Sequence, residues 1–91
     1  IQAVVVNYHS MGRCDACIRS LLQARDRLDF PLQITVVDNA PESPEGRELE
    51  ERYRDARVEF HLASTNLGFG GAVNAASARS DADAILILNP D

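Results

Sequence analysis

Two short apolar runs decide the fold, AVVVNY at residues 3–8 and ITVVDN at residues 34–39. Each is rich in β-branched residues and ends in turn-forming residues, a pattern that predicts strands covered on both faces. Two further runs, VEFHL at 58–62 and ILIL at 85–88, bring the set to four. The run at 58–62 alternates apolar with polar residues, which places it at an edge of the sheet.

Helical patterns separate these runs. The first connection carries an apolar stripe with spacings of three, four and seven, which predicts a helix. The second has one narrow apolar face on a charged background, and the third opens with GFGG at residues 68–71 and continues with small residues. Alternating strands and helices predict an α/β fold with a parallel sheet, and residues 1–91 are long enough for one domain at most. Right-handed crossovers then favour the strand order 3-2-1-4, with helices on both faces.

In this order, the second and third strands are added on one side of the first strand and the fourth strand on the other side. The first and fourth strands therefore flank the point at which the strand order reverses. Ligands of open α/β sheets bind outside the carboxyl ends of the strands at such a point. The polar residues that follow the first, second and fourth strands are therefore expected to border one pocket. They are Asn7, Tyr8, Asp38, Asn39, Asn89 and Asp91.

The fourth strand is wholly apolar and would lie at the other edge of the sheet. Natural proteins avoid exposed apolar edges because such edges pair with other chains. We therefore expect the sheet to continue beyond Asp91 in the natural protein, so that residues 1–91 form an incomplete fold. The segment on its own is expected to self-associate through this edge.

Composition and charge exclude several classes of protein. The 91 residues carry 14 acidic and 9 basic side chains, a net charge of −5, which argues against a partner such as duplex nucleic acid or an anionic membrane. All basic residues are arginines, so a Walker A loop and a Schiff-base lysine are excluded. No apolar run approaches the ~20 residues of a membrane span, and the two cysteines suit a reducing, cytoplasmic location.

Two segments could contact a nucleotide, and each has a purely structural alternative. Asp38 directly follows the second strand, where it could accept hydrogen bonds from a nucleoside or simply shape a turn. The glycines at 68–71 precede a helix start that could approach a phosphate, or they form a loop before an Ala-rich core helix. The dinucleotide pattern G-x-G-x-x-G fails here, because its third glycine falls at Val73.

Two other segments have a possible chemical role. Asp91 follows the fourth strand, where a carboxylate could hold Mg²⁺ or Mn²⁺ on a diphosphate or could end a turn. The pair Cys14-Asp15-Ala16-Cys17 matches C-x-x-C, which suggests a thioredoxin-like redox domain. Both cysteines lie on the apolar stripe with Ile18, which favours burial as small hydrophobic side chains.

Taken together, five ordered segments resemble the start of family 2 glycosyltransferases, which have the GT-A fold. The segments are VVVNY at 4–8, CIRSLLQ at 17–23, VVDN at 36–39, NLGFGGAVN at 66–74 and LNPD at 88–91. The GFGG and NPD forms most resemble the bacterial rhamnosyltransferase-like branch. The resemblance implies the nucleotide-binding half of a GT-A fold, without the acceptor half.

The resemblance also implies roles for individual residues. Asp38 would meet the base, and Asn7, Tyr8 and Asn39 would border the nucleoside pocket. Asp91 would hold the divalent metal, with Asn89 standing where the family usually has a first acid. The nucleotide side of the cleft would be lined by Asn66, Gly68, Gly70, Gly71 and Asn74.

The implied reaction transfers a sugar, with rhamnose one candidate, from a nucleotide-diphosphate donor to a hydroxyl of a glycan or lipid-linked acceptor, with inversion. The general base is expected beyond residue 91, so the segment alone should be inactive. The implied setting is bacterial cell-wall or polysaccharide synthesis, in the cytoplasm or at the inner face of the membrane. The alternative is a nucleotide-binding module without catalysis.

Overall fold

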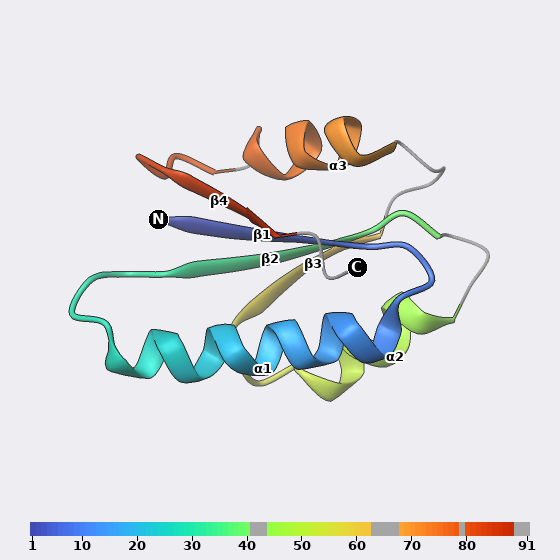
Figure 1. The fold of residues 1–91 in the computed structure, drawn as a ribbon, viewed down its shortest axis with the longest axis horizontal. Helices are drawn as coiled ribbons and strands as arrows, with labels where there is room; N and C mark the ends of the chain where they lie inside the picture. The colour runs from blue at the N-terminus through green and yellow to red at the C-terminus, as the bar shows by residue number, and fades with distance from the viewer. Residues whose placement is uncertain (41–43, 63–67, 79, 89–91) are drawn as a thin grey trace.

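The computed structural model describes residues 1–40, 44–62, 68–78 and 80–88. Strands and helices alternate along this part of the chain (Figure 1). The strands are β1 (Gln2–Asn7), β2 (Gln33–Asp38), β3 (Val58–Leu62) and β4 (Ile85–Leu88). The helices are α1 (Met11–Arg27), α2 (Glu45–Arg52) and α3 (Gly68–Ser77).

The strands form one sheet in the order β3-β2-β1-β4, and every neighbouring pair is parallel. The predicted α/β class and strand order are therefore confirmed. In the register of β1 and β2, Asn7 lies opposite Asp38. Asp38 in turn lies opposite Leu62 of β3. The last residues of the two central strands are thus neighbours at the carboxyl edge of the sheet.

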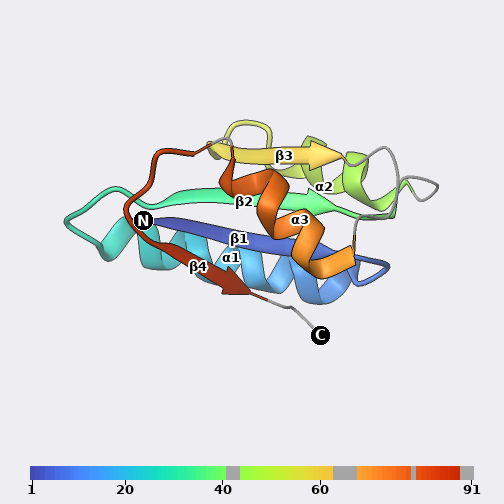
Figure 2. The same cartoon turned by 90° about the horizontal axis from the view of Figure 1, so that it is seen from above.

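Helices cover both faces of the sheet, as the alternating pattern predicts. Helices α1 and α2 lie together on one face, and α3 lies alone on the other (Figure 1). From above, α3 crosses β1 and β2 near the middle of the sheet (Figure 2). This arrangement leaves the carboxyl ends of β1 and β2 between the start of α3 and the start of α2.

Alternating side chains of β1 and β2 build two apolar clusters, one on each face. The cluster under α1 and α2 holds the bulkier side chains, and the cluster under α3 holds valines and alanines. The first consists of Ala3, Val5, Cys14, Ile18, Leu21, Ile34, Val36, Leu49 and Tyr53. The second consists of Val4, Val6, Val37, Ala72 and Ala76. Small residues on α3 let this helix approach the sheet closely.

Strand β4 forms the open edge beside β1. Its side chains Ile85, Leu86 and Ile87 are 40%, 49% and 45% exposed, whereas β1 is buried along its whole length. The expected apolar edge is therefore present within this chain. Among the described residues, none of the helices has the length and apolar character needed to cross a membrane.

Candidate functional site

The predicted site begins with the paired ends of β1 and β2. The side-chain amide of Asn7 donates a hydrogen bond from Nδ2 to Oδ1 of Asp38 over 3.2 Å. The backbone N–H of Ala40 donates to the same oxygen, also over 3.2 Å. The N–H of Asn39 donates to the backbone carbonyl of Asn7 over 2.8 Å, which continues the strand pairing past Asp38. The sequence-predicted residues Asn7, Asp38 and Asn39 are therefore brought together.

Asn7 also shapes the loop that leads into α1. Its Oδ1 accepts hydrogen bonds from the backbone N–H and from the hydroxyl of Ser10, over 3.3 and 3.2 Å. Between these residues, His9 adopts a left-handed backbone conformation with φ of 53°. The ring of Tyr8 lies edge-on to that of His9, with centroids 4.6 Å apart. The loop thus presents an aromatic pair beside the Asn7–Asp38 pair.

The polar groups differ sharply in exposure. Asn7, Asp38 and Asn39 are buried, at 0%, 3% and 2%, whereas Tyr8 is 49% exposed. Buried polar groups must be hydrogen-bonded to be tolerated, and Asn7 and Asp38 satisfy each other. Tyr8 is thus the exposed member of this group, and Asp38 is shielded from solvent.

Burial raises the pKa of the Asp38 carboxyl above its ordinary value. The hydrogen bonds from Ala40 and Asn7 oppose this rise, the nearby negative charge of Glu45 adds to it, and His9 lowers it. The dominant cause is loss of water around the charged form. The carboxylate is consequently a strong hydrogen-bond acceptor in a poorly solvated place.

Helix α2 packs against the Asp38 carboxylate at Gly46, a contact that the sequence did not indicate. A Cβ atom placed on Gly46 would collide with the Asp38 carboxylate and would lie 2.8 Å from Cδ2 of Leu62. No local pattern could have revealed the contact, because it depends on how α2 docks against the end of β2.

The start of α3 lies against the same edge of the sheet. The side-chain amide of Asn39 donates from Nδ2 to the carbonyl of Gly68 over 3.0 Å. Gly68 has a positive φ of 72°, a conformation that favours glycine. Among the atoms of the described residues, none lies within 4 Å of a Cβ placed on Gly68. The first turn of α3 is thus tethered to β2 beside Asp38.

The remaining predicted residues are placed less centrally. Gly71 is half-buried, while Gly70 and Asn74 are exposed one helical turn apart. Ala72 and Ala76 face the sheet, so helical geometry puts Asn74 on the outer side of α3. Residues Asn66, Asn89 and Asp91 lie outside the described residues.

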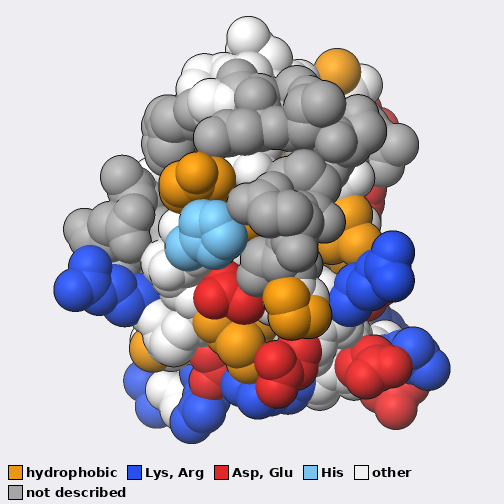
Figure 3. Space-filling model, turned by 90° about the vertical axis from the view of Figure 1, so that its right-hand side faces the viewer, with side chains coloured by type: hydrophobic (Ala, Val, Ile, Leu, Met, Phe, Trp, Pro, Cys, Tyr) orange, Lys and Arg blue, Asp and Glu red, His pale blue; other side chains and the backbone are white. Residues whose placement is uncertain are grey.

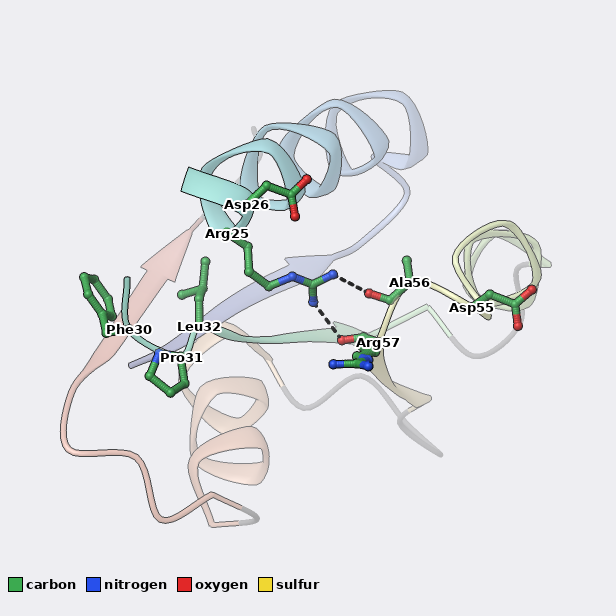
Figure 4. A pocket seen from close by; sticks show the side chains of 8 residues that line it. All are labelled: Arg25, Asp26, Phe30, Pro31, Leu32, Asp55, Ala56 and Arg57. Atoms are coloured by element: carbon green, nitrogen blue, oxygen red, sulfur yellow. Dashed lines mark hydrogen bonds between the residues drawn. The ribbon is translucent and has the colours of Figure 1, made fainter. Parts of the chain in front are cut away.

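Figure 3 looks onto this carboxyl edge, where acidic side chains extend from the lower centre to the lower right and arginines lie at the left, right and lower margins. The opposite, amino edge holds a separate cavity of about 510 Å³ between the end of α1 and the loop before β3 (Figure 4). There the Arg25 guanidinium donates to the carbonyls of Ala56 and Arg57, over 2.6 and 3.2 Å. Arg25 thus ties α1 to that loop, and the cavity lies far from the strand ends where α/β sheets bind ligands.

The C-x-x-C pair has the environment of core residues. Cys14 is buried and Cys17 is half-buried, and both are free thiols. Burial, with smaller contributions from nearby negative charges, raises the pKa of the Cys14 thiol to about 12. Redox cysteines instead need an easily formed thiolate. The structure therefore favours the hydrophobic interpretation of this pair over the redox one.

For metal binding, the candidate ligands are His, Cys, Asp and Glu side chains. Over the described ranges, no group of three or more His, Cys, Asp or Glu side chains is placed to hold a metal ion. Asp91, the predicted ligand, falls outside those ranges. The described residues therefore do not by themselves supply a metal centre.

A parallel sheet in the order β3-β2-β1-β4, covered by helices on both faces and with a polar pair at the carboxyl ends of β1 and β2, defines an open α/β fold. The chain belongs to Glycosyl transferase family 2, whose sequence pattern matches residues 3–91. This membership confirms the resemblance drawn from the ordered motifs.

Solved structures of TarS from S. aureus share the fold. TarS 1-349 superposes with a TM-score of 0.75 at 22% sequence identity, covering 99% of this chain and 27% of that one. A second TarS structure gives a TM-score of 0.68 at 24% identity, covering 99% of this chain and 16% of that one. The 91 residues thus span about a quarter or less of these chains. No curated protein matches the chain significantly.

Proposed function

We propose that the protein is an inverting glycosyltransferase and that residues 1–91 form its donor-binding part. The proposal is carried by one observation, the hydrogen-bonded pair of Asn7 and Asp38 at the carboxyl ends of the two central strands. Family membership supports the reaction class, because the family to which the chain belongs is one of glycosyltransferases. The donor in this proposal is a nucleotide-diphosphate sugar.

The donor is bound by groups with separate tasks. Tyr8, exposed beside His9, offers a face on which a base can stack. Asp38 offers a carboxylate oxygen to an N–H of the base, and Asn7 keeps that carboxylate in place. Gly68, which begins α3 without a side chain, is proposed to let the diphosphate approach the first turn of this helix.

Transfer then requires an acceptor hydroxyl to attack the anomeric carbon from the side opposite the leaving diphosphate. A general base must take the hydroxyl proton as the new bond forms. We place that base beyond residue 91, so residues 1–91 are proposed to bind donor without transferring sugar. Asp91 is proposed as the ligand of a divalent Mg²⁺ or Mn²⁺ ion, which when bound would stabilise the departing diphosphate.

The finer assignments rest on the motifs alone. The GFGG and NPD forms suggest a rhamnose donor and a glycan or lipid-linked acceptor in bacterial cell-wall or polysaccharide synthesis. Such an acceptor would bring the full-length protein to the inner face of the membrane. The exposed side chains of β4 are proposed to drive self-association when residues 1–91 are produced alone.

Calorimetric titration tests donor binding. The full-length protein is titrated with the diphosphates of uridine, guanosine, adenosine, cytidine and thymidine in the presence of Mn²⁺. We expect one of them to bind, and both Asp38→Ala and Tyr8→Ala to weaken it at least about tenfold, the effect of losing a hydrogen bond to a charged group or a stacking contact. Asp55→Ala is the matched control, because Asp55 lines the cavity at the opposite edge of the sheet.

The outcomes distinguish a glycosyltransferase from a nucleotide-binding module without catalysis. Affinity unchanged in both Asp38→Ala and Tyr8→Ala would contradict the proposed donor site. Binding without hydrolysis or transfer of any nucleotide sugar would instead favour a non-catalytic nucleotide-binding module. Asp91→Ala is expected to abolish the dependence of binding on Mn²⁺ while leaving metal-free affinity for the diphosphate unchanged.

A further inference from the structure

We infer that Gly46 is a positioning residue for donor recognition, because it fixes the direction in which the Asp38 carboxylate points. The inference rests on the proposed function, since it assigns the base contact to Asp38. Gly46 lies in the first turn of α2, whereas Asp38 ends β2. The two are brought together only by the docking of α2 on the sheet.

The Asp38 carboxylate is confined on two sides. One oxygen, Oδ1, accepts hydrogen bonds from Asn7 and Ala40. The other, Oδ2, lies against the backbone of Gly46, where an added Cβ would overlap it. The same Cβ would lie 2.8 Å from the carboxyl carbon of Asp38. A residue larger than glycine therefore cannot occupy position 46 while Asp38 keeps this orientation.

A methyl group at position 46 can be accommodated in only a few ways. The other close neighbour, Leu62, is 39% exposed, so its side chain can yield toward solvent. The Asp38 carboxylate is 3% exposed and hydrogen-bonded, so it can yield only by rotating away from Asn7 and Ala40 or by pushing α2 outward. Rotation moves the oxygen that is proposed to meet the base, and an outward shift of α2 removes the backbone that confines this oxygen.

The cost of Gly46→Ala should therefore appear in binding more than in folding. Alanine has a higher helix propensity than glycine. This gain in helix stability offsets part of the strain that the new methyl group causes in α2. Loss of an aligned hydrogen bond to a charged acceptor weakens binding about tenfold or more. Gly12→Ala in α1 is the matched control, because a Cβ there would meet no atom of the described residues within 4 Å.

The test combines affinity, spectroscopy and a double-mutant cycle. In the full-length protein, Gly46→Ala should weaken the tightest-binding nucleoside diphosphate at least about tenfold, while Gly12→Ala leaves affinity unchanged. The side-chain amide signal of Asn7 in ¹⁵N–¹H spectra should shift in Gly46→Ala and stay in place in Gly12→Ala. This signal reports the bond to Asp38 without any ligand.

The double variant Gly46→Ala/Asp38→Ala keeps the inference testable if Gly46→Ala unfolds. Asp38→Ala vacates the space that the new methyl group needs, so the double variant should be at least as stable as Asp38→Ala alone. If the two substitutions were additive in stability, or if the Asn7 signal did not move, Gly46 would not act through Asp38.

Failure of the proposed function looks different from failure of this inference. If the unmodified protein binds none of the five diphosphates, the proposed function fails. The Asn7 signal and the double-mutant cycle in stability still show whether Gly46 fixes the orientation of Asp38. If the protein binds donor, Asp38→Ala abolishes binding and Gly46→Ala leaves affinity unchanged, the inference alone is overturned.

Discussion

The two faces of the sheet are built differently, although the same strands supply both. Beneath α1 and α2, long side chains such as Ile18 and Leu49 fill the layer, and a charged group is also anchored there. Beneath α3, valines meet alanines, and Gln2 makes hydrogen bonds to Thr35 and to the carbonyl of Ala76. The first face carries the apolar bulk of the fold, and the second brings a helix start close to the strand ends.

The charged anchor is Asp15 of α1, which is 5% exposed. It accepts hydrogen bonds from the Tyr53 hydroxyl and from Arg52, the latter over 3.0 Å, and it pairs with Arg19. Burial alone would raise its pKa, but the hydrogen bonds from Tyr53, Arg52 and Arg19 outweigh burial and lower it. This anchor joins α1 to the end of α2, the helix that also supports Asp38.

The largest effect should come from the bulky face. Ile18→Ala deletes a fully buried side chain between α1 and the sheet, and it should lower the free energy of unfolding by about 2–5 kcal/mol. Val4→Ala, on the α3 face, removes fewer atoms and should cost less. Urea unfolding of both variants checks the ranking, and equal losses would show that the two faces contribute alike.

Removing the anchor should produce a smaller, pH-dependent effect. Asp15→Asn weakens charge-assisted hydrogen bonds and should cost about 1–3 kcal/mol at neutral pH. Because the folded state lowers the pKa of Asp15 below its ordinary 3.8, the stabilisation is present above that pH and is lost as the pH falls below it. Thermal unfolding against pH measures this, and Tyr53→Phe should lose part of the same stability.

Asp38→Asn should have the opposite sign. Burial raises the pKa of Asp38 in the folded state, so ionisation costs stability once the pH rises past its ordinary 3.8. Asparagine keeps the acceptor oxygen without the charge, so the variant should unfold at a slightly higher temperature at neutral pH and should bind nucleotide more weakly. A variant both less stable and unchanged in affinity would contradict the proposed role.

The smallest effect on stability is expected at the open edge. Ile87 is 45% exposed on β4, so Ile87→Lys should change the free energy of unfolding by less than about 0.5 kcal/mol. It should nevertheless suppress self-association of residues 1–91, because a charge at a strand edge opposes pairing. Sedimentation velocity over a range of concentrations measures this, with Glu50→Lys on the exposed side of α2 as the control.

Much of the architecture follows from local sequence patterns. The β-branched runs at 3–6 and 34–37 place the central strands, and the handedness of crossovers orders them. The meeting of Asn7 with Asp38 also follows, because parallel strands in this order end side by side. The roles of these residues toward a nucleotide remain predictions.

Other features were decided only by the tertiary structure. The contact of Gly46 with Asp38 joins a helix to a strand end, and the anchoring of Asp15 by Tyr53 joins residues 38 positions apart. Periodicity and composition report which side of an element is apolar, because burial acts along each element separately. They do not report which groups meet when elements dock, because that depends on the angle and offset with which packed side chains interlock.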